Sequence, residues 1–349
     1  MRVAIGFGMA GNEDWDQLSE YAVEAERLGV DFAWTAEAWG HDAATPLAYL
    51  AAKTSRIKLG AGIMQAVART PANLAMTSMT LASMSHGRFV LGLGASGPQV
   101  VEGWHGVPFR KPIQRIRELI EIVRIVSSGE RLQYEGQIYH LPLPGGEGKA
   151  LKSGARPQPD IPIYLATLSP KSLQLTGELA DGWIGTSFMP EHADVFFKDI
   201  ERGAQKAGRT LADIDLQAGG AVTFTDDVDA LVPRHKPGMA FTLGAMGSKE
   251  HNFYNAAFQR AGFQEEAQAV QRLWLEGKRK EAADLVPDEM VLKANLLGTE
   301  DMVRDRIRAY RDAGVTTLRV DPRGESMKDR LTILGRTVEL VKEVSAEKK

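Results

Sequence analysis

Short apolar runs that favour strands alternate with helix-length segments of 3.6-residue periodicity along most of this 349-residue chain. Eight such runs predict strands, at 2–7, 32–37, 57–63, 88–94, 163–166, 183–186, 214–223 and 317–320. Helical patterns follow seven of them, at 14–28, 46–54, 71–85, 113–127, 170–180, 191–207 and 327–344. Strand–helix units in this order place their strands in parallel, because each helix carries the chain back across the sheet. The alternation therefore predicts an α/β protein built as a (β/α)8 barrel.

Two segments interrupt the alternation, at about 98–160 and about 232–297. In the first, residues 131–141 alternate as in a β-hairpin, and the Gly-, Pro- and Lys-rich stretch after them is typical of a surface loop. In the second, helical patterns cover 256–261, 265–275 and 280–285. Both segments are too apolar and too regular for linkers, so we interpret them as insertions into a single barrel domain spanning 1–349. The tail from residue 344 to residue 349 has the composition of a fraying helix end.

Composition excludes several kinds of site and partner. The chain has no cysteine, which rules out disulfides and thiolate metal ligands, and its seven histidines lack metal-ligand spacing. A net charge of −3 without a basic stripe argues against a nucleic-acid partner. No apolar stretch approaches the ~20 residues of a membrane span, and the first strand begins without the apolar core of a signal peptide. We therefore expect a cytoplasmic protein with no metal site and no nucleic-acid or membrane partner.

A glycine-rich segment follows the fourth predicted strand, with the sequence Gly92-Leu93-Gly94-Ala95-Ser96-Gly97-Pro98. Its spacing matches the dinucleotide-binding fingerprint, but there the glycines open a helix after the first strand of a domain. Here the strand is the fourth, and later breakers predict no helix before about residue 113: Pro98, Gly103, Gly106, Pro108 and Pro112. We therefore predict a wide loop whose backbone N–H groups let a phosphate or a flat ring approach.

The loop continues as Ala95-Ser96-Gly97-Pro98-Gln99-Val100-Val101-Glu102-Gly103-Trp104-His105-Gly106. This sequence resembles that of the luciferase-like monooxygenase superfamily, and within it the branch that depends on the deazaflavin coenzyme F420. The branch includes methylenetetrahydromethanopterin reductases and actinobacterial enzymes, and the resemblance covers essentially the full chain. It implies an oxidoreductase that transfers hydride between coenzyme F420 and a small organic substrate. It also implies a homodimer joined through the early barrel helices.

Two other functions remain open at this point. An FMN-dependent monooxygenase can use the same barrel with reduced flavin from a reductase partner. Only the sequence of residues 95–106 favours F420 over FMN. A non-catalytic flavin-binding barrel is the second alternative. Ala38 keeps it open, because some sugar-phosphate dehydrogenases of the superfamily have a catalytic histidine at this place.

Active sites of such barrels lie at the carboxyl ends of the strands, which directs attention to the end of the second strand. Glu37 there is either a solvated loop carboxylate or an acid that faces the coenzyme ring, and the resemblance favours the acid. His41 in the loop that follows is a candidate proton donor, and we assign both residues as catalytic. Trp39, Trp104 and His105 are assigned to the substrate pocket, although a core or interface role suits either tryptophan equally well.

The other strand ends carry small or polar residues, which suit a flat, uncharged ring system. We assign cofactor binding to Glu37, Gly62, Ile63, Met64, Gln65, Gly94, Ala95, Ser96, Gly97, Thr167, Leu168, Ser169 and Thr186. For the Gly62–Ile63 bond the resemblance implies a cis peptide at a bulge. Ser169 suits either phosphate binding or a plain helix N-cap, since both use the N-terminus of the next helix.

Two further groups of residues carry weaker signals. Lys249, His251, Asn252 and Tyr254, in the second insertion, suit a lid over the site or, with more weight, a solvated helix face. The eighth strand ends in Arg319-Val320-Asp321, to which the sequence assigns no role.

Overall fold

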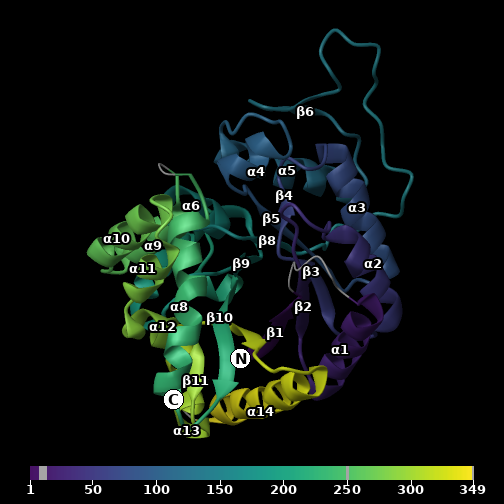
Figure 1. The fold of residues 1–349 in the computed structure, drawn as a ribbon. Coiled ribbons are helices and arrows are strands. Elements are labelled where there is room, and N and C mark those ends of the chain that lie inside the picture. Colours follow the sequence, from purple (N-terminus) through teal and green to yellow (C-terminus); the bar gives the residue numbers. More distant parts are fainter. Residues whose placement is uncertain (8–13, 249–250, 348–349) are drawn as a thin grey trace.

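The strands of the computed structural model, which describes residues 1–7, 14–248 and 251–347, form a closed parallel barrel (Figure 1). The barrel strands are β1 (Arg2–Gly6), β2 (Phe32–Thr35), β3 (Lys58–Ala61), β5 (Phe89–Gly94), β8 (Ile163–Leu165), β9 (Gly182–Ile184), β10 (Asp215–Phe224) and β12 (Thr317–Pro322). Each pairs in parallel with the next, and β12 closes the ring on β1. The predicted (β/α)8 barrel is confirmed, with strand bounds within two residues of those expected.

Four short strands accompany the barrel. β4 (Met64–Gln65) continues the path of β3 and pairs with β5, and β11 (Leu296–Gly298) pairs with the far end of β10. β6 (Tyr134–Glu135) and β7 (His140–Leu141) form the antiparallel hairpin that the alternation of 131–141 predicts.

Helices surround the barrel, one after nearly every strand (Figure 1). The ring consists of α1 (Trp15–Leu28), α2 (Ala44–Lys53), α3 (Pro71–Met84), α5 (Pro112–Ser127), α6 (Pro170–Leu179), α7 (Asp194–Lys206), α13 (Glu300–Asp312) and α14 (Met327–Ala346). α13 lies where no helix was predicted, although Val303, Ile307 and Tyr310 have helical spacing and are buried. Among the described helices, none is both long and apolar enough to cross a membrane.

Large aromatic side chains fill the inside of the barrel. Phe32 and Trp34 of β2 stack with ring centroids 5.8 Å apart, and Tyr164 of β8 packs against both. Gly60 makes this possible, because a Cβ there would lie 2.2 Å from the Trp34 ring. The barrel is therefore a packed core and not a channel, as is usual for this fold.

A buried carboxylate closes the amino end of the barrel. Asp215, the first residue of β10, accepts hydrogen bonds from the Tyr164 hydroxyl at 2.8 Å and the Thr317 hydroxyl at 2.7 Å. It also pairs with the Arg2 guanidinium at 2.7 Å. Since Arg2 and Thr317 begin their strands, this polar cluster lies at the end opposite the strands' carboxyl termini.

The first predicted insertion is divided by a helix of the ring. α5 packs between α3 and α6, so only the segments on either side of it leave the barrel. Glu118 of α5 is fully buried and accepts three consecutive backbone N–H groups, those of residues 137–139, at 2.7–3.0 Å. This carboxylate anchors the β6–β7 hairpin to the ring, while the rest of the segment extends outward as a long loop (Figure 1).

The second insertion forms a helical layer on one side of the barrel, drawn in green in Figure 1. Its helices are α8 (Val228–Ala245), α9 (Phe253–Arg260), α10 (Gln264–Leu275), α11 (Arg279–Asp284) and α12 (Asp288–Ala294). The positions of α9 to α11 agree with the prediction, but α8 and α12 were not predicted. α8 contains Pro233 and Pro237, which disfavour a helix interior. Packing against α10, α11 and α12 outweighs this local preference.

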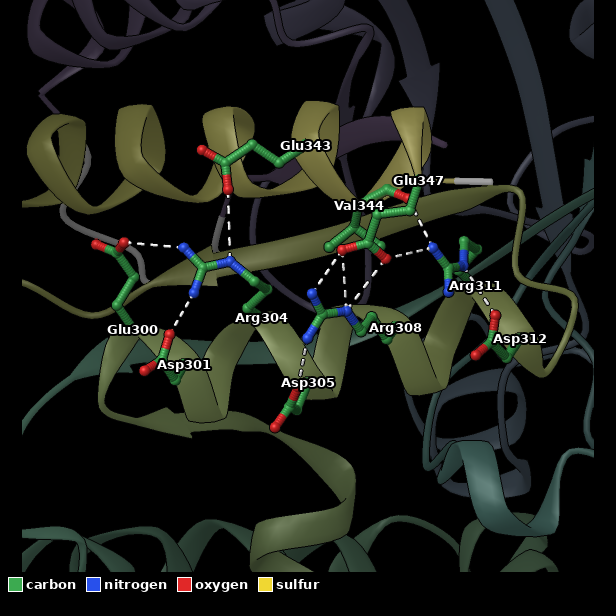
Figure 2. Close-up of polar contacts among 10 residues, drawn as sticks. All are labelled: Glu300, Asp301, Arg304, Asp305, Arg308, Arg311, Asp312, Glu343, Val344 and Glu347. Atoms are coloured by element: carbon green, nitrogen blue, oxygen red, sulfur yellow. Dashed lines mark hydrogen bonds and ion pairs between the residues drawn. The ribbon is translucent and has the colours of Figure 1, made fainter. Parts of the chain in front are cut away.

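The last helix ends in a network of ion pairs instead of the expected frayed turn (Figure 2). Glu347 contacts Arg308 at 2.5 Å and Arg311 at 2.9 Å, both on α13, and Arg304 of α13 reaches Glu343 at 3.4 Å. Hydrogen bonds from Arg308 and Arg311 lower the pKa of Glu347 to about 2. The prediction of fraying was wrong up to residue 347, because tertiary partners on α13 hold the end of α14.

Candidate active site

The carboxyl ends of the parallel strands meet at one mouth of the barrel, where β1 ends at Gly6, β2 at Thr35 and β5 at Gly94. The Asp215 cluster closes the opposite end. Because ligands of such barrels bind at the carboxyl ends of the strands, the candidate site lies at this mouth.

The third barrel strand bulges as it reaches the mouth. Gly60 pairs with Val90 and Met64 pairs with Leu93, so four residue steps on one strand oppose three on the other. The peptide bond between Gly62 and Ile63 within this bulge is cis. A bulge re-aims the backbone and its side chains, and here it turns residues 62–63 toward the mouth.

Gly94 makes room for the side chain of that bulge. A Cβ at Gly94 would lie 2.4 Å from Cδ1 of Ile63, so the isoleucine side chain lies across the glycine. Met64 and Gln65, which follow the bulge, are buried. The structure therefore brings together four of the assigned residues, which meet where β4 pairs with the end of β5.

Glu37 is buried and paired, not solvated. Its carboxylate forms a two-pronged ion pair with Arg69, at 2.8 and 3.1 Å, and accepts the backbone N–H of Gln65 at 2.8 Å and of Ala43 at 3.0 Å. Only 8% of the Glu37 side chain is exposed. The solvated alternative was wrong, and a carboxylate with four donors is better suited to position its neighbours than to exchange a proton.

Arg69 is a site residue that the sequence analysis missed. It lies 32 positions after Glu37, in the loop that follows β4, and 15% of its side chain is exposed. Nothing in the local sequence marks an arginine in a loop as the partner of a distant carboxylate.

Gln65 links the end of the second strand to His105. Its side-chain NH2 group donates to the carbonyls of Glu37 at 3.2 Å and Ala38 at 2.9 Å, which leaves its Oε1 facing Nε2 of His105. An amide oxygen only accepts hydrogen bonds, so Nε2 of His105 carries the proton in this contact. The predicted pocket residue His105 and the predicted cofactor residue Gln65 are thus in direct contact.

His41 lies in a neighbouring cavity. Its ring meets Trp15 edge-on with centroids 5.0 Å apart, and a cavity of about 460 Å³ is lined by these two residues with Asp42, Thr45, Pro46 and Tyr49. The lining comes from the first turn of α1, the first two turns of α2 and the loop before α2, at the rim of the mouth. Trp39 and Trp104 are 57% and 65% exposed, so the structure does not bury either in a core.

The glycine-rich loop opens a short helix, contrary to the prediction. Ser96 has a positive φ of 59°, Gly97 caps the next segment, and Pro98–Gly103 form α4. Proline at the first helical position is compatible with a helix, because its missing N–H has no intrahelical partner there. The loop is spacious at Gly97, where a Cβ would meet only the side chain of Gln99, at 3.6 Å.

The fifth barrel strand leads into a capped helix. Ser169 is the N-cap of α6 and forms a capping box with Ser172, so the N-cap interpretation is confirmed. The hydroxyl of Thr167 pairs with that of Thr176 inside the core at 2.7 Å. That hydroxyl is thereby turned away from a ligand, whereas Thr186 at the end of the next strand is exposed.

The candidate lid residues have different surroundings. Lys249 lies outside the described residues, and His251 is exposed. Asn252 is buried and donates to the carbonyl of Leu243 at 2.8 Å, and burial raises the pKa of Tyr254. The solvated-face interpretation was therefore wrong for Asn252 and Tyr254.

A second arginine, Arg319 of β12, reaches the mouth from inside the barrel. Its Nη1 donates to the carbonyl of Gly185 at 3.2 Å, directly after the end of β9. The signal for it in the sequence is a lone charge between Leu318 and Val320, which are buried on the outer face of the strand. Within the described ranges, no three His, Asp or Glu side chains gather as a metal site.

Comparison with known proteins gives one consistent result. The sequence profile of the luciferase-like monooxygenases matches residues 3–317. A Mycobacterium tuberculosis protein provisionally named a coenzyme F420-dependent oxidoreductase is 40% identical over 326 residues, which cover 91% of this chain and 94% of that protein. The 5,10-methylenetetrahydromethanopterin reductase of Archaeoglobus fulgidus is 30% identical over 92% of this chain and 94% of its own length.

A solved structure agrees with these sequence matches. The coenzyme F420-dependent tetrahydromethanopterin reductase of Methanopyrus kandleri superposes with a TM-score of 0.80 and 26% identity. The superposition covers 97% of this chain and 99% of that one.

Proposed function

Because the chain belongs to the luciferase-like monooxygenase family, we propose that it is a coenzyme F420-dependent oxidoreductase that transfers hydride between the coenzyme and a small organic substrate. The observation that carries the proposal is the bulge at Gly62–Ile63, which presents backbone and an apolar side chain to the mouth beside Gly94. A planar tricyclic ring needs a flat apolar support of this kind on one face, while the other face stays open to substrate. The Mycobacterium tuberculosis relative and the Methanopyrus kandleri structure, both named for coenzyme F420, support the choice of this coenzyme over FMN.

The residues of the mouth fit this coenzyme. Ile63 and Gly94 would support the ring, and the open loop of Ala95, Ser96 and Gly97 would receive its phosphate. When bound, the coenzyme supplies the hydride chemistry, and the protein supplies orientation and electrostatics.

The chain's own polar residues have positioning roles in this proposal. Glu37 and Arg69 hold the ends of β2 and β4 together, and Gln65 fixes the imidazole of His105 through its amide oxygen. His105 thereby presents a fixed ring at the substrate side, with Trp104 beside it in the chain. His41, in the neighbouring cavity, is the candidate proton donor.

A homodimer joined through the early helices and a cytoplasmic location are part of the proposal. The exposed side chains of Met76 and Met84 on α3 support the dimer, because exposed apolar side chains on one helix favour burial against another surface. The absence of cysteine is compatible with a reducing compartment.

The first prediction is that the purified protein binds oxidised coenzyme F420 at micromolar concentration or tighter, and FMN at least tenfold more weakly. Quenching of the intrinsic fluorescence of each ring, titrated in parallel, measures both dissociation constants. Tight binding of FMN alone would replace the proposal with the FMN-dependent monooxygenase. Tight F420 binding without hydride exchange with any alcohol, ketone or pterin tested would favour a non-catalytic barrel.

The second prediction concerns the glycine-rich loop. Gly97→Asn is expected to weaken F420 binding about tenfold or more, because the added side chain occupies the open loop and competes for its N–H groups. Asparagine is a good N-cap, so the melting temperature should stay within about 2 °C of that of the wild type. Gly154→Asn, in an exposed loop where a Cβ meets nothing within 4 Å, is the control. Equal affinity in all three proteins would remove the loop from the site.

A further inference from the structure

Arg319 is a partly buried cation with no carboxylate partner in the part of the chain that the structure describes. Its nearest acid along β12, Asp321, pairs instead with Arg323 at 2.5 Å, on the exposed side of the strand end. Its Nε is buried and has no hydrogen-bonding partner among the described residues. A protein interior tolerates an uncompensated charge poorly, so a buried guanidinium of this kind needs an explanation.

The guanidinium lies at the level of the mouth, not in the depth of the barrel. Nη1 donates to the carbonyl of Gly185, which follows the last residue of β9. Nη2 is the atom nearest to the place of a Cβ on Gly6, the last residue of β1, at 4.0 Å. Gly6 has no side chain to cover this flank of the guanidinium, and Arg319 as a whole is partly exposed.

The charge of Arg319 persists at neutral pH. Burial lowers its pKa to about 10, and the negative charge of Asp321 acts in the opposite direction. A partly desolvated guanidinium offers several N–H donors in a planar fork and attracts negatively charged or carbonyl oxygens.

We propose that Arg319 is a ligand-binding residue at the floor of the mouth, where its guanidinium takes up a carbonyl or negatively charged oxygen of the bound molecule. Two molecules bring such oxygens to this place: the coenzyme, through the carbonyls of its ring, and an anionic substrate, through a carboxylate or phosphate. The position of the coenzyme in this argument rests on the proposed function.

Folding stability supplies the first test, because a ligand-binding cation and a structural one behave differently when removed. Arg319→Met keeps the length of the side chain and removes a buried charge that has no ion-pair partner. Its melting temperature is therefore expected to equal or exceed that of the wild type. A melting temperature lowered by more than about 5 °C would assign Arg319 to the framework and overturn the proposal.

Ligand binding supplies the second test and separates the two sources. Titration with oxidised coenzyme F420, followed by fluorescence quenching, is expected to show a dissociation constant about 10- to 100-fold higher for Arg319→Met, with a smaller increase for Arg319→Lys. If the coenzyme affinity is unchanged, the substrate is the source. Millimolar inorganic phosphate or acetate should then raise the melting temperature of the wild type and not that of Arg319→Met.

The control is Arg323→Met, which removes a charge from the same strand end but from an exposed, paired position. It should change neither the F420 affinity nor the response to anions by more than about twofold. If Arg319→Met binds F420, phosphate and acetate as the wild type does, the proposal is wrong. Failure of the wild type to bind F420 would refute the proposed function alone, and the anion measurements would still decide the role of Arg319.

Discussion

Glu37→Gln is expected to lower the free energy of unfolding by about 3–5 kcal/mol and to weaken F420 binding beyond what that loss of stability explains. The substitution removes the charge that compensates Arg69, whose side chain is 15% exposed, while Glu37 itself is 8% exposed. It also places an amide NH2 group against donors, since the carboxylate accepts from Arg69 and from two backbone N–H groups. Asp42 remains 3.8 Å from the Arg69 guanidinium, but its side chain is 45% exposed, so it replaces the buried Glu37 carboxylate only in part. A charge left undercompensated in so little solvent costs far more than a surface pair contributes.

The expected weakening of F420 binding follows from the contacts that Glu37 makes. The N–H group that it accepts from Gln65 lies directly after the bulge, and the Gln65 side chain fixes His105. In the proposed function, loosening this contact shifts both the bulge that would support the ring and the imidazole of His105. Urea unfolding measures the stability, and the F420 titration at a temperature where the variant is fully folded measures the site.

A double-mutant cycle gives this prediction its control. Arg69→Met alone should also destabilise the protein, whereas Glu37→Gln with Arg69→Met should cost less than the sum of the two, because neither buried charge of the pair remains and Asp42, which also contacts Arg69, is 45% exposed. Glu24→Gln, which breaks the exposed pair with Arg27 (41% and 70% exposed), should cost less than about 1 kcal/mol. If Glu37→Gln matches Glu24→Gln in stability and binds F420 normally, the buried pair has no role in the site.

Glu26→Gln is expected to lower the free energy of unfolding by about 3 kcal/mol at pH 7. It should also make the free energy of unfolding depend less on pH below about pH 5. Glu26 is a buried carboxylate of α1 that accepts the N–H groups of Ser55, Arg56 and Ile57 at 3.0, 2.6 and 2.7 Å. Burial raises its pKa, but these hydrogen bonds and one from the Ser55 hydroxyl outweigh burial and lower the pKa from 4.5 to about 2. Through these hydrogen bonds the carboxylate connects α1 to residues 55–57, directly before β3.

The direction of the pH effect follows from the lowered pKa. Glu26 binds a proton more readily in the unfolded chain, so its contribution is complete above about pH 5 and is lost as the pH falls toward 2. The difference in unfolding free energy between wild type and Glu26→Gln should therefore shrink as the pH falls from 5 to 3. Chemical denaturation across this range measures it. Glu20→Gln, an exposed position on the same helix, should show a pH-independent difference of less than about 0.5 kcal/mol. A constant difference for Glu26→Gln at all pH values would contradict the argument.

Local periodicity was enough to predict the barrel. The spacing of apolar residues depends only on near neighbours in the chain, and it located the barrel strands within two residues of their observed bounds. Glycines and prolines likewise marked the loop at the end of β5, although they suggested no helix where Pro98 in fact begins α4. The resemblance carried by residues 95–106 led to the family that the comparisons show.

Tertiary structure decided what the side chains at the mouth do. Glu37 forms a buried ion pair because the fold brings Arg69, 32 positions later in the chain, next to it. The hydroxyl of Thr167 forms a hydrogen bond with that of Thr176 in the core. α8 formed despite two internal prolines, because helices up to some 60 residues further on cover its apolar side chains. The proposed ligand-binding role of Arg319 depends on the closed barrel, which places its guanidinium between the ends of β1 and β9. Periodicity is a local property that a sequence displays directly, whereas the pairing and burial of charges depend on which distant segments the closed barrel brings together.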